Sequence, residues 1–118
     1  MTAWQIRRAG PSDEAAILSA DVFDGPATRE GTARFLGDGA GGRDILMLAE
    51  LAGRFVGFAS GSVLYHPDKA PQLFIQEVGV NEEARRQGIA RALVAAIRGE
   101  ARKRGCTATC VLTETENS

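Results

Sequence analysis

The feature that most constrains the fold is a strand–helix–strand unit in the second half of the chain. Residues Gln72–Val80 read QLFIQEVGV and residues 106–113 read CTATCVLT, and both runs are rich in the β-branched and apolar side chains typical of strands. Between them, Ile89, Leu93 and Ile97 recur at the spacing of one helix face. A strand, a long helix and a second strand in this order predict a right-handed crossover that makes the two strands parallel.

Both ends of this helix carry signals of their own. Asn81, followed by Glu82 and Glu83, predicts a polar cap and an acidic first turn. At the other end, basic residues precede Gly105, which suits the left-handed conformation that stops a helix. We therefore expect the long helix to occupy the segment between Asn81 and Gly105.

The first half of the chain predicts an antiparallel meander with two helices. A strand within residues 2–10 is followed by a helix start at residues 11–14 and by a second helix over residues 27–36. The segments DILMLAEL and RFVGFASGSVLY then form two strands joined by a turn at Ala52 and Gly53. The order β-α-α-β-β-β-α-β indicates an α+β fold with a mostly antiparallel central sheet.

Composition indicates one soluble domain, residues 1–118. The chain has 118 residues, of which 44% are hydrophobic and 25% charged, enough for a single core. Its net charge of −1 argues against generic nucleic-acid binding. Neither a membrane-length apolar run nor a signal peptide is visible in the sequence, so we expect a cytoplasmic protein with no membrane partner.

The few potential metal ligands predict no metal site. On one strand, Cys106 and Cys110 would lie about 13 Å apart, which is beyond the reach of a disulfide. One histidine and two such cysteines show no spacing typical of zinc ligands. We therefore expect two reduced cysteines and no bound metal.

The segment after Val80 is the strongest candidate for a binding site. Free backbone N–H groups at a helix start attract anions, and Gly88 and Ala90 are small enough to let a phosphate approach the backbone. Arg85 and Arg86 add positive charge. From spacing alone, the same segment also fits a solvated helix start whose glycine serves packing. The P-loop and dinucleotide-binding glycine patterns are absent.

The string RRQGIA resembles the [Q/R]-x-x-G-x-[G/A] motif of the GNAT superfamily of acyl-CoA-dependent N-acyltransferases, which also lies between a strand and a long helix. The similarity in element order runs from Trp4 to Thr113, and EVGV, RRQGIARALV and VLTETENS resemble the aminoglycoside 3-N-acetyltransferase branch. The resemblance implies a GNAT-like sheet with a splayed parallel strand pair. It also implies acetyl transfer from acetyl-CoA to a primary amine of a small molecule, with an aminoglycoside as one candidate.

The resemblance further implies which residues hold coenzyme A. Those around its pyrophosphate would be Arg85, Arg86, Gln87, Gly88, Ile89 and Ala90, acting mainly through backbone amides. Backbone groups of Val78 and Val80 would bind the pantetheine arm as an added strand does, and Gly79 fits a bulge that opens the gap. Asn117 matches the family's pantetheine-contacting Asn, with a plain turn residue as the alternative.

For catalysis, Glu77 is the candidate general base. The attacking amine must be neutral, so an ammonium substrate first loses a proton. Related aminoglycoside enzymes carry an acid on this strand, and Ile75 and Val78 predict apolar surroundings that raise the pKa of Glu77. The alternative is an exposed strand residue paired with an arginine. The backbone N–H near Val78 is expected to polarise the thioester oxygen during a direct transfer.

The acceptor pocket is expected between the first two helices and the loop after the third strand. Asp21, Asp24, Glu30 and Asp68 lie in these segments, where they predict attraction of a cationic amine. For each of them, solvated surface charge is the alternative. His66 is interpreted as a residue of the loop.

The sequence departs from the family pattern at its end. It stops at Ser118, before the family's last helix, with its tyrosine that protonates the thiolate, and before its last two strands. The lone tyrosine, Tyr65, lies on the wrong strand. Two alternatives to a small-molecule acetyltransferase therefore stay open: a non-catalytic acyl-CoA-binding remnant and a protein-amine acetyltransferase. An unprotected final strand at residues 106–113 also predicts pairing with a second copy as a homodimer.

Overall fold

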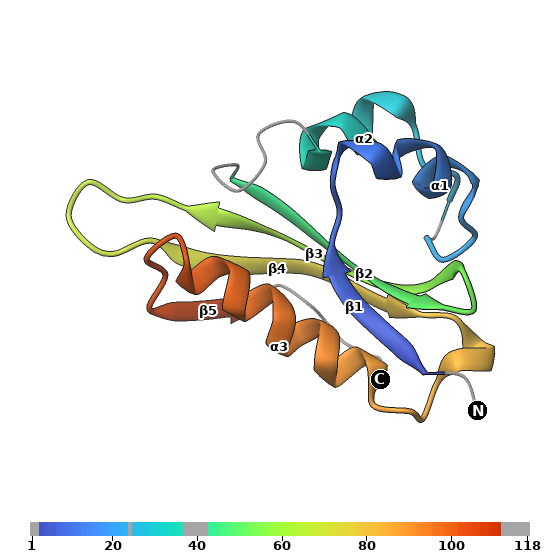
Figure 1. Cartoon of the computed structure of the whole chain (residues 1–118). Coiled ribbons are helices and arrows are strands. Elements are labelled where there is room, and N and C mark those ends of the chain that lie inside the picture. Colours follow the sequence, from blue (N-terminus) through green and yellow to red (C-terminus); the bar gives the residue numbers. More distant parts are fainter. Residues whose placement is uncertain (1–2, 24, 37–42, 112–118) are drawn as a thin grey trace.

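The computed structural model describes residues 3–23, 25–36 and 43–111, which form one mixed sheet with helices on both faces (Figure 1). The strands lie in the order β1-β2-β3-β4-β5; β1 to β4 pair antiparallel, and β5 pairs parallel with β4. In chain order the elements are β1 (Trp4–Arg8), η1 (Pro11–Asp13), α1 (Glu14–Ser19), α2 (Arg29–Leu36), β2 (Asp44–Leu51), β3 (Arg54–Leu64), β4 (Gln72–Val80), η3 (Glu82–Ala84), α3 (Ile89–Arg102) and β5 (Ala108–Val111). The predicted α+β fold and element order are confirmed.

The β2–β3 hairpin forms where the sequence predicts it. Leu51 pairs with Arg54 across a two-residue turn at Ala52 and Gly53. Both turn residues have positive φ, +54° and +82°, which is the conformation of the tight turns that match the twist of paired strands.

Helix α3 closes one face of the sheet with an aliphatic stripe (Figure 1). Its buried residues are Ile89, Leu93, Ile97 and Ala101, which recur every four positions and so share one face. They pack in one cluster with inward-facing residues of the central strands, namely Ile45, Met47, Ala49, Val56, Ala59, Val63, Leu73 and Ile75. Helix α3 thus connects β4 to β5 across this face, and the two strands run parallel.

The short helices α1 and α2 cover the opposite face (Figure 1). Ile17 of α1 and Leu36 of α2 pack in a second cluster together with Leu48, Phe55 and Phe58 of the sheet. Helix α2 begins at Arg29, two residues later than predicted, and the Thr28 side chain accepts a hydrogen bond from the N–H of Gly31 at 3.0 Å. Thr28 therefore supplies the polar cap of this helix.

The predicted start of the long helix is wrong. Asn81 precedes the separate turn η3, and α3 begins only at Ile89 with Gly88 as its N-cap. The chain leaves the helical conformation between them, because Arg85 is extended and Arg86 has a φ of +67°. Gly88, at φ +82°, takes up the left-handed conformation that turns the chain into the helix.

The predicted stop at Gly105 is confirmed. Gly105 has a φ of +88°, and the N–H of Cys106 donates to the carbonyl of Ala101 at 3.2 Å. Cys106 is buried beneath α3, and β5 begins two residues later than predicted, at Ala108. Thr113 and Asn117 lie outside the described residues.

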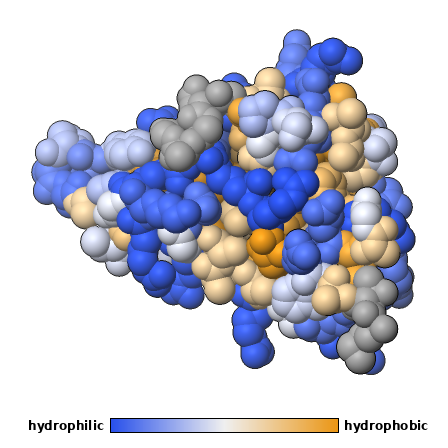
Figure 2. Space-filling view, in the orientation of Figure 1, coloured by the Kyte–Doolittle hydropathy of each residue, from blue (hydrophilic) through white to orange (hydrophobic). Residues whose placement is uncertain are grey.

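The surface in Figure 2 is largely hydrophilic, including the projecting connection between β3 and β4, with hydrophobic patches between the polar side chains. Within the described ranges, no helix is long and apolar enough to cross a membrane. The same part of the chain holds no group of three or more His, Cys, Asp or Glu side chains placed to bind a metal ion.

Candidate functional site

A β-bulge in β4 places two consecutive side chains on the same face of the sheet. The register pairs Ser60 with Glu77 but Gly61 with Ile75, so Gln76 is the extra residue. In a regular strand, Gln76 and Glu77 would face opposite sides. Here both line a cavity on the α2 side, whereas Ile75 is buried beneath α3. The bulge thus gives this cavity a second polar side chain from β4.

The resemblance connected a bulge in this strand with Gly79. The bulge lies three residues earlier, at Gln76. A Cβ at Gly79 would lie 2.8 Å from Cε1 of Phe58. Glycine at this position therefore leaves room for the ring of Phe58, which lines the cavity. That ring packs against Phe23, with centroids 4.6 Å apart and planes tilted by 55°.

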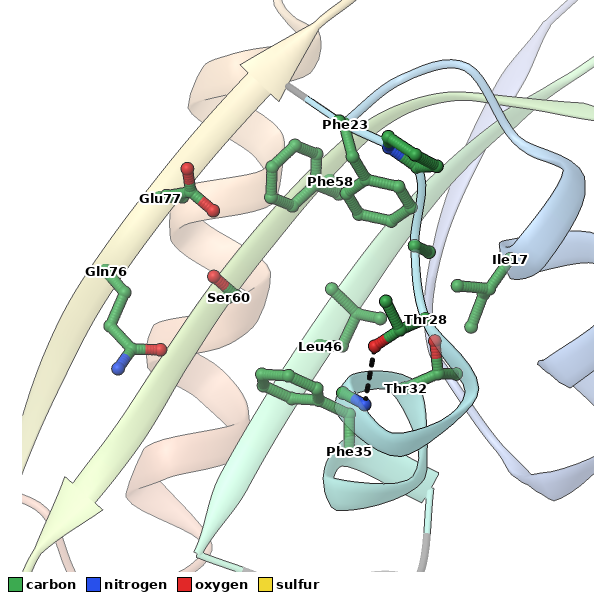
Figure 3. Close-up of a pocket in the computed structure, with 14 residues that line it drawn as sticks. Ile17, Phe23, Thr28, Thr32, Phe35, Leu46, Phe58, Ser60, Gln76 and Glu77 are labelled. Carbon is green, nitrogen blue, oxygen red and sulfur yellow. Dashed lines mark hydrogen bonds between the residues drawn. The ribbon is translucent and has the colours of Figure 1, made fainter.

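The cavity beside Glu77 has a volume of about 320 Å³ and lies between the sheet and the α1–α2 layer. Figure 3 shows Gln76 and Glu77 at the β4 end, with the rings of Phe23, Phe58 and Phe35 around the middle. Its lining consists of Ile17, Phe23, Gly25, Pro26, Ala27, Thr28, Gly31, Thr32, Phe35, Leu46, Phe58, Ser60, Gln76 and Glu77. This open, mostly apolar cavity with a few polar groups is typical of a small-molecule site.

The surroundings of Glu77 differ from those that the sequence suggested. Ile75 lies in the core under α3, and strand alternation turns Val78 toward that same face. The apolar wall near Glu77 comes instead from Phe58 on the neighbouring strand. In the described ranges no arginine or lysine forms an ion pair with Glu77, so its exposed carboxylate is available to a ligand.

The far edge of β4 presents backbone groups to a ligand. In the described part of β5, the parallel ladder ends opposite Ile75. On the other edge, the N–H of Asn81 donates to the carbonyl of Val56 at 2.8 Å, so alternate residues turn their backbone groups to β3. The N–H and C=O groups of Val78 and Val80 therefore face away from β3. An extended ligand chain can add here as a strand does.

The connection between β4 and α3 forms a second cavity, of about 480 Å³. Its lining residues are Val80, Ala84, Arg85, Arg86, Gly88, Ile89, Ala90 and Arg91. The carbonyl of Gly88 accepts the first helical hydrogen bond, from the N–H of Ala92 at 3.0 Å. The N–H groups in the turn before Ala92 therefore have no acceptor within the helix, and they lie at its positive end. A phosphate group fits this position.

The arginines of this second cavity behave differently from one another. Nε of Arg85 donates to the carbonyl of Val80 at 3.1 Å, which holds this side chain against the end of β4. Arg86 lines the cavity at positive φ, whereas Gln87 is exposed and outside the lining. Arg91 also lines it and was missed in the sequence; its place in the first turn after Gly88 was the available signal.

Two of the acids expected at the acceptor pocket lie elsewhere. Asp21 accepts a hydrogen bond from Nδ2 of Asn81 at 3.3 Å. Neither Asp21 nor Glu30 is among the residues that line the cavity beside Glu77. Asp24 lies outside the described residues. In this region, the interpretation of Asp21 and Glu30 as solvated surface charge fits the structure better.

The expected contribution of the β3–β4 connection to the pocket is wrong. Asp68 lies 3.6 Å from Nζ of Lys69, and Nε2 of His66 lies 2.9 Å from Oε1 of Gln72. The cavity beside Glu77 is not lined by Asp68, His66 or Tyr65. The connection projects beyond the end of the sheet instead (Figure 1).

Several wall residues of the cavity were not singled out in the sequence: Phe35, Phe58, Ser60 and Gln76. Ser60 is 6% exposed on a strand of mostly apolar side chains, and that polar interruption was a readable signal. Gln76 had none, because only the pairing register shows the bulge. Phe35 and Phe58 belong to apolar patterns that fit a closed core as well as they fit the wall of a cavity.

A known protein family and solved structures are similar to this chain over the segments that form both cavities. The sequence model of the Acetyltransferase (GNAT) family matches residues 14–118. No curated protein matches the sequence. A solved structure of the aminoglycoside N-acetyltransferase AAC(6')-Iy, in complex with the bisubstrate analogue CoA-S-monomethyl-acetylneamine, has a TM-score of 0.78 and 22% identity, covering 98% of this chain and 82% of that one.

Two further solved structures are similar. An aminoglycoside acetyltransferase from an uncultured soil metagenomic sample, in complex with sisomicin, has a TM-score of 0.73 and 20% identity, covering 95% of this chain and 78% of that one. A ribosomal-protein-alanine N-acetyltransferase from Brucella melitensis biovar Abortus 2308 has a TM-score of 0.73 and 20% identity, covering 97% and 82%. At such identities these structures establish the shared fold, which by itself does not set the substrate.

Proposed function

Because the chain belongs to the GNAT acetyltransferase family, we propose that it is an N-acetyltransferase that transfers an acetyl group from acetyl-CoA to a primary amine of a small molecule. One observation carries this proposal. The cavity beside Glu77, the edge of β4 that the described part of β5 leaves unpaired, and the cavity at the start of α3 follow one another along residues 76–91.

The described residues fit coenzyme A at two places. Backbone N–H groups from Gly88 to Ala90, with Arg86 and Arg91 beside them, suit the charge of a pyrophosphate. The backbone groups of Val78 and Val80, which the described part of β5 leaves unpaired, suit the amide-containing pantetheine arm. When bound, acetyl-CoA supplies an acetyl group activated as a thioester. The proposed cofactor-binding residues also include Arg85, Gln87, Ile89, Gly79 and Asn117.

Glu77 is the proposed general base. Its carboxylate lies at the β4 end of the cavity, next to Val78 on the strand. An acceptor ammonium held in the cavity would donate its proton to this carboxylate, directly or through one water, which leaves the neutral amine that can attack. The N–H of Val78 faces the free edge, where it would donate to an oxygen that gains negative charge. Both groups would serve a direct transfer, in which the amine nitrogen bonds to the acetyl carbon, the C–S bond breaks and coenzyme A leaves as its thiolate.

The aminoglycoside acetyltransferases among the solved neighbours favour a small-molecule acceptor, whereas one further neighbour is a ribosomal-protein-alanine N-acetyltransferase. The neighbours named above that act on aminoglycosides include a 6'-type enzyme, and they lend no support to the 3-N branch that the sequence suggested. The proposal is therefore made for a primary amine, without a position on an aminoglycoside ring.

The test combines calorimetric titration of acetyl-CoA with a thiol-release assay. We expect Gly88→Leu to weaken acetyl-CoA binding by roughly tenfold or more, because a side chain would fill the backbone cradle and strain a left-handed position. The matched control is Gly99→Ala, within α3, where a Cβ meets nothing within 4 Å. Retained affinity in Gly88→Leu would contradict the placement of the pyrophosphate.

The base is tested separately with Glu77→Gln. We expect turnover to fall by about 100-fold while acetyl-CoA affinity is unchanged, because a glutamine cannot take up the proton. Glu82→Gln, an exposed acid in η3, is the control and should keep wild-type turnover. Unchanged turnover in Glu77→Gln between about pH 6 and pH 9 would remove Glu77 from the mechanism.

A further inference from the structure

The geometry of the cavity beside Glu77 points to an acceptor class. Resting on the proposed acetyltransferase function, we propose that the acceptor is an aromatic amine with a single positive charge, such as an arylalkylamine, rather than a polycationic aminoglycoside or polyamine. The wall, the charges and the size of the cavity all favour this class of acceptor.

Aromatic rings dominate the wall. Phe23 and Phe58 lie on one side of Leu46 and Phe35 on the other, and Ile17 lies farther from β4 (Figure 3). The Phe23 and Phe58 rings already pack against each other with a centroid distance of 4.6 Å. A ligand ring inserted among them leaves water and gains the tilted ring contacts that aromatic groups favour.

The charge of the cavity matches one ammonium group. Among the described residues of its lining, Glu77 alone is charged. The other polar side chains are neutral: Gln76, Ser60, Thr28 and Thr32. Thr28 already accepts a hydrogen bond from the N–H of Gly31. A polycation would bring further ammonium groups against this wall without counter-charges, and the desolvation of each is unfavourable.

Two acids on the same side of the sheet, Asp13 and Asp21, are already engaged, and Glu30 of α2 does not line the cavity. Asp13 accepts two hydrogen bonds from the Arg7 guanidinium, at 2.9 and 2.7 Å. Asp21 accepts from Asn81, and neither acid lines the cavity. They therefore do not supply the counter-charges that a polycation needs.

Size and orientation agree with this class. A volume of about 320 Å³ is at the small end of ligand cavities, which suits a body of one ring system. Because Glu77 lies at the β4 end, an ammonium paired with it lies next to Val78, while the ring occupies the aromatic middle. The amine then lies at the free edge of β4, where the acetyl group is proposed to arrive.

The experiment measures kcat/KM by thiol release for 2-phenylethylamine and tryptamine, for spermidine, and for kanamycin. We expect the arylalkylamines to exceed both polycations by roughly tenfold or more. A preference for kanamycin or spermidine would overturn the proposal.

Gln76→Glu sharpens the test, because it adds a second carboxylate beside Glu77 at an exposed position with almost no change in volume. We expect this variant to raise kcat/KM for spermidine relative to 2-phenylethylamine by roughly tenfold. Gln5→Glu, exposed on β1, is the matched control and should leave the ratio unchanged. An unchanged ratio in Gln76→Glu would contradict the role of charge number in the cavity.

Phe35→Ser tests the aromatic wall, with Tyr65→Ser, exposed and outside the cavity, as its control. We expect only Phe35→Ser to lower kcat/KM for 2-phenylethylamine, by roughly tenfold. Acetyl-CoA affinity, measured by calorimetry, should stay at the wild-type value and so report that the variant is folded. An equal response of the two variants would contradict the wall assignment.

A binding measurement separates this proposal from the proposed function. Ligand-observed NMR follows 2-phenylethylamine with the wild-type chain and with Phe35→Ser, without cofactor. Binding that is lost in Phe35→Ser supports the aromatic cavity even if no acetyl transfer is found, in which case the acetyltransferase proposal alone fails. No binding at millimolar amine overturns the aromatic acceptor even if acetyl-CoA binds.

Discussion

The two faces of the sheet are built by different means. On one face, α3 packs Ile89, Leu93 and Ile97 directly onto aliphatic strand residues, so the layer is closed. On the other face, two short helices pack with aromatic rings and leave a cavity of about 320 Å³ beside Glu77. An ion pair between Asp13, just before α1, and Arg7 of β1 helps to attach this layer to the sheet.

We therefore expect the α3 face to contribute most of the stability and the α1–α2 face to bind the acceptor. A long helix with a continuous aliphatic stripe buries apolar surface along most of its length, and such burial is the dominant favourable term in folding. A layer of short helices gives up part of that packing and gains a lined cavity. The comparison predicts that mutations on the two faces will separate stability from activity.

The largest effect is expected from truncating the α3 stripe. Leu93→Ala should lower the free energy of unfolding by about 3 kcal/mol, because a fully buried side chain is lost and a void remains. Phe35→Ala, which removes a half-buried ring that already borders a cavity, should lower it by about 1 kcal/mol. Urea unfolding of both variants gives the values. Equal losses would contradict the division between the faces.

The polar attachment of the α1 side should depend on pH. Two hydrogen bonds from the Arg7 guanidinium lower the pKa of Asp13, against the opposing effect of burial. A carboxyl with a lowered pKa stabilises the folded state above its ordinary pKa, and this contribution is lost as the pH falls through the folded-state value. Asp13→Asn should therefore be about 2 kcal/mol less stable at neutral pH.

The difference between wild type and Asp13→Asn should shrink below about pH 4. Chemical unfolding at several pH values measures it. Asp68→Asn, at an exposed acid, is the control and should stay within about 0.5 kcal/mol of wild type. A difference for Asp13→Asn that is constant down to acid pH would show that the ion pair does not hold this layer.

Two glycines on opposite faces offer a finer comparison. A Cβ at Gly61 would lie 2.9 Å from the carbonyl oxygen of Phe74 and 3.1 Å from Cδ1 of Ile97, inside the closed layer. A Cβ at Gly79 would meet the ring of Phe58, which borders the cavity and has room to move. We expect Gly61→Ala to lose about 2 kcal/mol and Gly79→Ala about 1 kcal/mol in urea unfolding. The reverse order would contradict this picture.

The smallest perturbation tests how tightly α3 closes its face. Burial raises the pKa of the Cys106 thiol, against the opposing charge of Arg104, so less reactive thiolate is present at a given pH. In a Cys110→Ser background, Cys106 should react with a thiol reagent at about pH 8 roughly tenfold more slowly than a cysteine in a short peptide. Labelling at the peptide rate would show that this face opens readily.

Much of the fold could be predicted from local patterns. The β2–β3 hairpin, β4 and the end of α3 lie where alternation, helical spacing and Gly105 place them. The start of α3 could not, because Asn81 with two acids is a good local cap, whereas the actual chain path depends on positive φ at Arg86 and Gly88. Local cap signals do not reveal such a detour.

The candidate site divides in the same way. Its anion cradle is contiguous in sequence and could be identified from residues 85–90. The cavity beside Glu77 gathers side chains from α1, α2 and three strands, so its lining could not be predicted from any one segment. The expected acids were chosen by sequence position, and Asp21 and Asp68 lie outside the cavity because their side chains have other neighbours.

By itself, the sequence determined the order of the elements, the crossover that makes β4 and β5 parallel, and the segment of residues 85–90 suited to a phosphate, because each of these depends on residues close together in the chain. Only the tertiary structure decided that Gln76 and Glu77 face one aromatic cavity. Strand alternation sets which side a residue faces, and one bulge, placed by pairing with β3, reverses that assignment for every residue beyond it.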